Sequence, residues 1–108
     1  MHQRSFAIQS ATIQGVEAIP VLVEVVISNG IPSFSIVGMA DVTIMESRER
    51  VKAALRASGF VMPTDKIVIN LAPGALKKTG SGFDLPIALG ILAATGQIEK
   101  EGIPLEIT

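Results

Sequence analysis

The ten-residue run from Ile19 to Ser28, IPVLVEVVIS, constrains the fold of this chain more than any other segment. Every second residue from 21 to 27 is valine or isoleucine, while the positions between them include Glu24. A period of two is typical of a β-strand with one face in a core. The segment therefore predicts an amphipathic strand that leans toward burial, in a protein built on a β-sheet.

Three further segments carry strand patterns. Residues 5–13 alternate before a glycine, residues 33–38 (SFSIVG) alternate again, and residues 66–72 (KIVINLA) are typical of a buried strand. Asn29-Gly30 follows the strand 19–28 directly and supplies the two residues that a type I′ hairpin turn prefers. We therefore expect the strands 19–28 and 33–38 to pair antiparallel in a mostly antiparallel meander.

Two segments predict helices. Asp41 is an N-cap candidate for residues 42–58, where an apolar stripe opposes a charged face and Gly59 follows as the stop. Asp84 is a second N-cap candidate, and the residues after it, LPIALGILAATG, are apolar on every side. We expect the first helix to be amphipathic and the second to be almost completely buried.

These elements follow one another in the order β-β-β-α-β-α, which predicts an α/β fold of the α+β two-layer sandwich type. The chain has 108 residues, 48% of them hydrophobic, and a net charge of -1, so residues 1–108 are expected to form a single domain. It contains no cysteine and no run near the ~20 apolar residues of a membrane span. We expect a cytoplasmic protein without membrane contact, and another strand beginning at residues 103–107.

No catalytic or metal site emerges from the residues. Gly74 and Gly80 are separated by five residues, whereas a phosphate-binding Walker A loop needs four and then a lysine, so no nucleotide cofactor is expected in this segment. The single histidine, His2, lies at the chain end and offers a poor start for a metal site or a general base. Capping explains Asp41 and Asp84 without chemistry.

Lys77 and Lys78 are the candidate nucleic-acid contacts. Both lie on a glycine-flanked loop before a predicted helix, whose N-terminal amides carry partial positive charge. The alternative is that both lysines only solvate a mobile loop. A net charge of -1 argues against strong autonomous DNA binding, because such binding needs several phosphate contacts.

Three blocks of the sequence carry a family resemblance. The blocks are EVVISNGIPSFSIVGMAD, ESRERVKAALRASGF and INLAPGALKKTGSGFDLPIALGILAATGQI. Together they resemble the N-terminal, Lon-protease-domain-like module of the ComM family, a family of magnesium-chelatase-like bacterial AAA+ proteins. The likeness extends over residues 5–98. It implies a fold similar to the proteolytic domain of Lon, to GHMP kinases and to domain two of ribosomal protein S-five.

The resemblance also bears on catalysis. Lon-type peptidases carry Asp-Gly-Pro-Ser-Ala around the nucleophilic serine, and the matching stretch here is Asp84-Leu85-Pro86-Ile87-Ala88. Ile87 stands at the nucleophile position, and an alkyl side chain has no lone pair with which to attack. The resemblance therefore implies a module without a catalytic residue and without peptidase activity.

The function implied by the resemblance is that of a non-catalytic interaction module in an AAA+ ATPase. The family implies a homohexameric DNA branch-migration helicase of natural transformation and recombination, with ATP and Mg²⁺ bound in an AAA+ domain downstream of residue 108. The expected partners are that AAA+ domain, the neighbouring subunits and DNA. The alternatives are a degenerate peptidase-like accessory domain that grips protein substrates, and a magnesium-chelatase-related subunit. The last is disfavoured because the sequence shows no carboxylate cluster for Mg²⁺.

Overall fold

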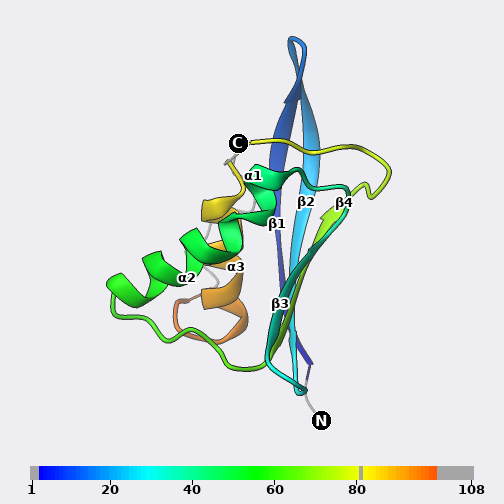
Figure 1. Cartoon of the computed structure of the whole chain (residues 1–108). Helices are drawn as coiled ribbons and strands as arrows, with labels where there is room; N and C mark the ends of the chain where they lie inside the picture. The colour runs from blue at the N-terminus through cyan, green and yellow to red at the C-terminus, as the bar shows by residue number, and fades with distance from the viewer. Residues whose placement is uncertain (1–2, 81, 100–108) are drawn as a thin grey trace.

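The computed structural model describes residues 3–80 and 82–99, and in it three helices lie against one face of a four-stranded sheet (Figure 1). The strands are β1 (Gln3–Gln14), β2 (Glu17–Ser28), β3 (Ser33–Val37) and β4 (Lys66–Ala72), and the helices are α1 (Val42–Met45), α2 (Ser47–Ala57) and α3 (Asp84–Ala94). The predicted two-layer α/β sandwich is confirmed. The predicted helix 42–58 is divided at Glu46 into α1 and α2.

The strand order is β1-β2-β4-β3, which shows that the predicted pairing of β2 with β3 is wrong. β4 lies between them, antiparallel to β2 and parallel to β3. Parallel neighbours need a crossover connection, and α1 and α2 provide it between β3 and β4. At Gly30 the φ angle is +157°, far from the roughly +60° of a type I′ turn. The apolar strand β4 lies between β2 and β3. The burial of its side chains there outweighs the tendency of Asn29-Gly30 to form a tight hairpin turn.

The tight hairpin of the sheet joins β1 to β2. Gln14 pairs with Glu17 across a loop of two residues, Gly15 and Val16. Gly15 has a φ of +62°, and a glycine at the first loop position matches a type II′ hairpin, whose twist suits the flanking strands. From the sequence, Gly15 was predicted only to end the first strand.

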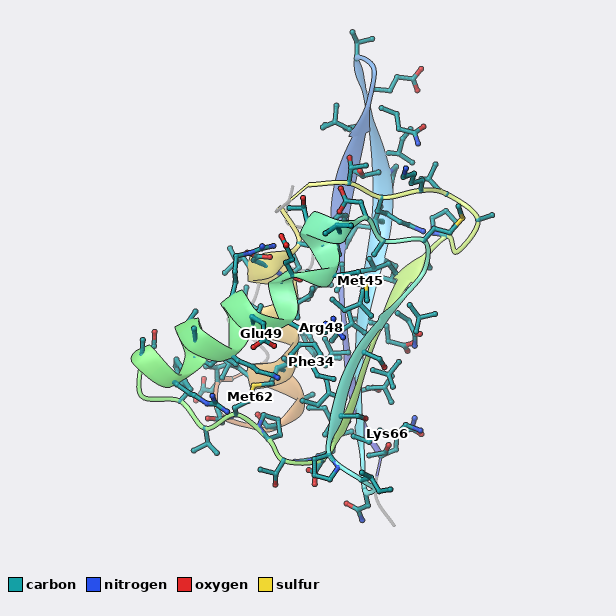
Figure 2. All side chains as sticks on the ribbon, in the orientation of Figure 1. Phe34, Met45, Arg48, Glu49, Met62 and Lys66 are labelled. Atoms are coloured by element: carbon teal, nitrogen blue, oxygen red, sulfur yellow. The ribbon has the colours of Figure 1, made fainter. Side chains whose placement is uncertain are left out.

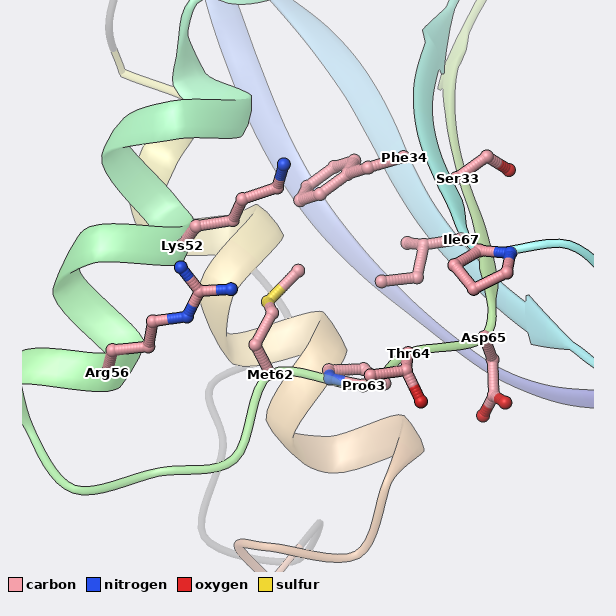
Figure 3. Close-up of a pocket in the computed structure, with 10 residues that line it drawn as sticks. Ser33, Phe34, Lys52, Arg56, Met62, Pro63, Thr64, Asp65 and Ile67 are labelled. Carbon is pink, nitrogen blue, oxygen red and sulfur yellow. The ribbon is translucent and has the colours of Figure 1, made fainter.

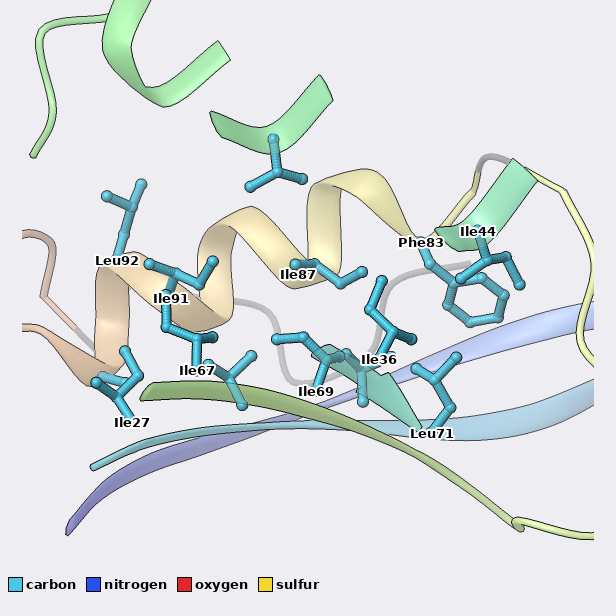
Figure 4. Close-up of a cluster of buried hydrophobic side chains, with 14 of the residues drawn as sticks. Ile27, Ile36, Ile44, Ile67, Ile69, Leu71, Phe83, Ile87, Ile91 and Leu92 are labelled. Carbon is cyan, nitrogen blue, oxygen red and sulfur yellow. The ribbon is translucent and has the colours of Figure 1, made fainter. Parts of the chain in front are cut away.

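The core lies between the sheet and α3. Figure 4 shows Ile87 and Ile91 of α3 facing the sheet side chains Ile67 and Ile69. The alternating face predicted for the strand 19–28 is confirmed, since its four inward side chains are fully buried: Val21, Val23, Val25 and Ile27. The burial of α3 is also confirmed for most of its residues, and Leu85 is an exception with 56% exposure.

Close packing of α3 on β2 depends on a glycine. A Cβ added to Gly90 would overlap the Cγ2 atom of Val25. Any side chain at position 90 would therefore push α3 away from the sheet, and the buried contact with Val25 would open.

The caps of the first helical segment agree with prediction. The backbone N–H of Ile44 donates to Oδ1 of Asp41 at 2.8 Å, which confirms Asp41 as an N-cap. At the other end Gly59 follows the C-cap Ser58 and has a φ of +83°, as a helix-stopping glycine should.

The strand predicted at residues 103–107 lies outside the described residues, as does His2. Among the residues that the structure describes, no helix is long and apolar enough to cross a membrane.

Candidate functional site

Two loops meet beside the N-terminal end of α3. Residues 38–41 connect β3 to α1, and residues 73–80 lead from β4 toward α3. The backbone N–H of Lys78 donates to the carbonyl of Met39 at 3.0 Å, and the N–H of Asp41 donates to the carbonyl of Lys78 at 3.1 Å. The second loop is therefore fixed to the first in a short parallel bridge between Ala40 and Lys78.

The side chain of Lys78 lies inside this junction, with 0% of the residue exposed. Its Nζ donates to the carbonyl oxygen of Gly38 at 2.8 Å and to that of Pro73. Burial lowers the pKa of Lys78, because desolvation disfavours the charged form. The prediction that Lys78 contacts nucleic acid is wrong, since the ammonium bonds two carbonyls of its own chain and cannot reach a phosphate.

Lys77, in contrast, is exposed. Its assignment as a nucleic-acid contact stays a prediction. The sequence did not separate the two lysines because both have the same glycine-flanked neighbourhood, and only the bridge to Ala40 determines which of them turns inward.

Asp41 and Gly38 explain why the loops approach so closely. While Oδ1 of Asp41 caps α1, its Oδ2 accepts from the backbone N–H of Gly80 at 3.2 Å, so one carboxylate holds both loops. A Cβ at Gly38 would overlap the carbonyl oxygen of Leu71, and the φ of Gly38 is +122°, which only glycine adopts freely. The junction is thus a closely packed structural contact between the two loops.

Asp84 was predicted as an N-cap, and this is wrong. Phe83 is the N-cap, and Asp84 is the first helical residue, where its carboxylate faces α2 instead of the backbone. Arg50 Nε lies 2.6 Å from Oδ2 of Asp84, and Arg50 Nη2 lies 3.0 Å from Oδ1. This two-point hydrogen bond raises the pKa of Arg50 and ties α2 to α3.

Ile87 stands where the resemblance places a nucleophile, and its side chain is fully buried in the core (Figure 4). It offers neither a nucleophilic atom nor access to a substrate. Within residues 3–80 and 82–99, no group of three or more histidine, cysteine, aspartate or glutamate side chains is placed to hold a metal ion.

A cavity of about 230 Å³, which the sequence did not predict, lies between α2 and the end of the sheet. Lys52 and Arg56 extend from α2 over its opening, toward Phe34 and Met62 (Figure 3). The remaining lining residues come from the entry into β3 and from the segment that leads into β4: Pro32, Ser33, Pro63, Thr64, Asp65 and Ile67. The four-residue spacing of Lys52 and Arg56 was a signal that could have placed both on one helix face.

Comparison with known proteins agrees with the resemblance to the ComM family. The family model described as subunit ChlI of Mg-chelatase matches residues 23–106. The competence protein ComM of Haemophilus influenzae is 46% identical over 92 residues, which are 85% of this chain and 18% of that protein.

Two YifB proteins are also similar. The YifB protein of Salmonella typhimurium is 49% identical over 89 residues, which are 82% of this chain and 18% of that protein. The YifB protein of Escherichia coli is 49% identical over 84 residues, which are 78% of this chain and 17% of that protein. The chain thus spans less than a fifth of the length of these curated relatives. Because the family model matches most of the chain, the chain belongs to the family described as subunit ChlI of Mg-chelatase, to which its resemblance to ComM also points.

Proposed function

We propose that this domain is a non-catalytic interaction module of a ComM-type AAA+ ATPase that moves branched DNA during natural transformation and recombination. In this proposal the ATPase domain lies beyond residue 108 and binds ATP and Mg²⁺. The protein acts in the cytoplasm as a homohexamer, and the module contacts its own ATPase domain and the neighbouring subunits.

The observation that carries the proposal is the burial of Ile87, together with 46% identity to a protein named for competence. An inert, fully buried side chain at the position of a peptidase nucleophile supports a binding role over a hydrolytic one. The junction around Lys78 supports the same view, because its hydrogen bonds commit this lysine of the glycine-rich loop to structural contacts.

The alternative activity is that of an unfoldase accessory domain gripping polypeptides. The DNA motor and the unfoldase would both hydrolyse ATP. They are distinguished by which ligand, DNA or unfolded polypeptide, raises the ATPase rate of the full-length protein. We expect a four-way DNA junction or single-stranded DNA to raise the rate, and an unfolded polypeptide to leave it unchanged. Stimulation by unfolded polypeptide but not by DNA would exclude the DNA motor and favour the accessory-domain alternative.

A further inference from the structure

Three cations share one face of α2. Arg48, Lys52 and Arg56 follow one another at intervals of four residues, so each side chain lies about one helical turn, ~6 Å, beyond the last. Like charges at this spacing destabilise an isolated helix by a few tenths of a kcal/mol per pair. The helix therefore carries a linear array of positive charge that its own stability does not require.

Nearby carboxylates leave most of this charge unbalanced. Lys52 Nζ lies 3.4 Å from Oε2 of Glu49, but Glu49 is 80% exposed in its side chain, and an exposed pair of this kind is weak. Asp65, which also lines the cavity, is paired with Arg4 at 2.7 Å. Within the described part of the chain, Arg56 makes no ion pair.

Arg48 is held differently from the other two. Its Nε donates to the carbonyl of Met45 at 3.0 Å and its Nη1 to that of Phe34 at 3.5 Å. Among the described residues, its charge therefore meets backbone oxygens and no carboxylate. Figure 2 shows Arg48 directed from α2 toward Phe34. The array is thereby anchored to β3 at one end.

Two apolar side chains, Phe34 and Met62, line the cavity beneath the cations. Phe34 and Met62 are only partly buried and lie across from Lys52 and Arg56 (Figure 3). An aromatic ring and a flexible thioether can both pack against a flat unsaturated ring, and cations on the rim can hold the anionic group attached to it.

We propose that the cavity between Phe34, Met62, Lys52 and Arg56 binds one nucleotide of single-stranded DNA. The base stacks on Phe34 beside Met62, and Lys52 and Arg56 contact the flanking phosphates. This inference rests on the proposed function and adds to it the place where the module contacts the strand.

The arrangement fits a nucleic-acid strand better than an acidic peptide. Cations that track a backbone beside an aromatic platform are the common device of proteins that bind single strands without reading sequence. The ~6 Å step between Lys52 and Arg56 along α2 is close to the separation of neighbouring phosphates in an extended strand. An acidic peptide would use the cations but has no general need for an aromatic face.

The test is binding of a fluorescent oligo-dT to the full-length protein, measured by anisotropy over a range of salt concentrations. Arg56→Gln should lower the slope of log affinity against log salt by about 0.7 per engaged subunit, and the double variant Lys52→Gln/Arg56→Gln by about 1.4. Phe34→Leu should weaken binding about five- to 150-fold through loss of stacking, with the salt slope unchanged.

Lys66→Gln is the matched control. Lys66 is an exposed lysine at the start of β4, it is directed away from Phe34 and Met62 in Figure 2, and its loss removes one positive charge as Arg56→Gln does. Its affinity and salt slope should equal those of the wild type. Melting curves of all variants serve as the check that each remains folded.

The outcomes separate this site from the proposed function. If the wild type binds oligo-dT while Arg56→Gln behaves like Lys66→Gln, or Phe34→Leu loses no affinity, the strand does not lie in this cavity and the inference is overturned alone. If the wild type binds neither oligo-dT nor a four-way junction, the proposed function fails as well. Binding of a Glu- and Phe-containing peptide that depends on Arg56, without binding of oligo-dT, would also overturn the inference.

Discussion

The ammonium of Lys78 donates a 2.8 Å hydrogen bond to the carbonyl oxygen of Gly38, forty residues earlier in the chain. This contact joins the loop after β3 to the loop after β4, and it occupies the lysine that the sequence had suggested for DNA. Two adjacent lysines therefore have separate roles, with Lys78 inside the fold and Lys77 on its surface.

Lys78→Ala should destabilise the domain by about 2–4 kcal/mol, because it leaves the carbonyls of Gly38 and Pro73 without their donor and opens a void. Lys77→Ala should change the free energy of unfolding by less than about 0.5 kcal/mol, as expected for an exposed side chain. Chemical denaturation of both variants measures the contrast. Equal effects of the two substitutions would contradict the burial of Lys78.

The stability of the domain should also depend on pH through Lys78. Burial lowers its pKa in the folded state below the ~10.4 of the unfolded chain, so between these two values the unfolded state binds more protons. The free energy of unfolding contributed by Lys78 therefore increases as pH rises toward about 10.4. Lys78→Met has no group that titrates at this position. The free energy of unfolding of the wild type minus that of Lys78→Met should therefore grow with pH. A difference that falls toward alkaline pH would contradict this sign.

Arg50 and Asp84 should show favourable coupling. A double-mutant cycle with Arg50→Gln and Asp84→Asn isolates the contact between α2 and α3, in which two hydrogen bonds of 2.6 and 3.0 Å join the side chains. Both side chains are partly exposed, at 38% and 32%, so the coupling should shrink when salt is raised. Replacing Lys52 and Glu49 in a parallel cycle is the control, since that pair is longer and Glu49 is more exposed. A coupling no larger than that of the control pair would show that α2 and α3 are held by apolar contacts alone.

Lys77 remains the exposed cation of the glycine-rich loop. If it contacts a phosphate backbone in the assembled protein, Lys77→Ala should weaken binding of duplex or branched DNA equally across sequences and lower the salt slope by about 0.9 per engaged subunit. The measurement is a salt titration of DNA affinity in the full-length protein with ATPase activity intact. Wild-type affinity and slope in the variant would show that Lys77 only solvates its loop.

The elements of the fold were predictable, and their arrangement was not. Alternation identified the buried face of β2, and Asp41 and Gly59 marked the ends of the first helical segment, because each of these signals acts over a few residues. Strand order depends instead on where β4 can bury its apolar residues, which the Asn29-Gly30 signal does not report.

The candidate sites failed to emerge for the same physical reason. The environments of Lys78 and Asp84 are set by Gly38 and Arg50, partners 40 and 34 residues away. Phe34 and Met62 reach Lys52 and Arg56 only after β3 and the segment before β4 have packed beside α2. Local patterns gave Lys78 and Asp84 roles that these distant contacts replaced.

We propose that this domain is a binding module within a DNA-moving ATPase and performs no chemistry itself. The most direct measurement compares branch migration of a four-way DNA junction by the full-length protein and by a version that lacks residues 1–108. We predict that the shortened protein still hydrolyses ATP but migrates the junction poorly. Junction migration at the full-length rate without residues 1–108, or peptide hydrolysis by the full-length protein, would contradict the claim.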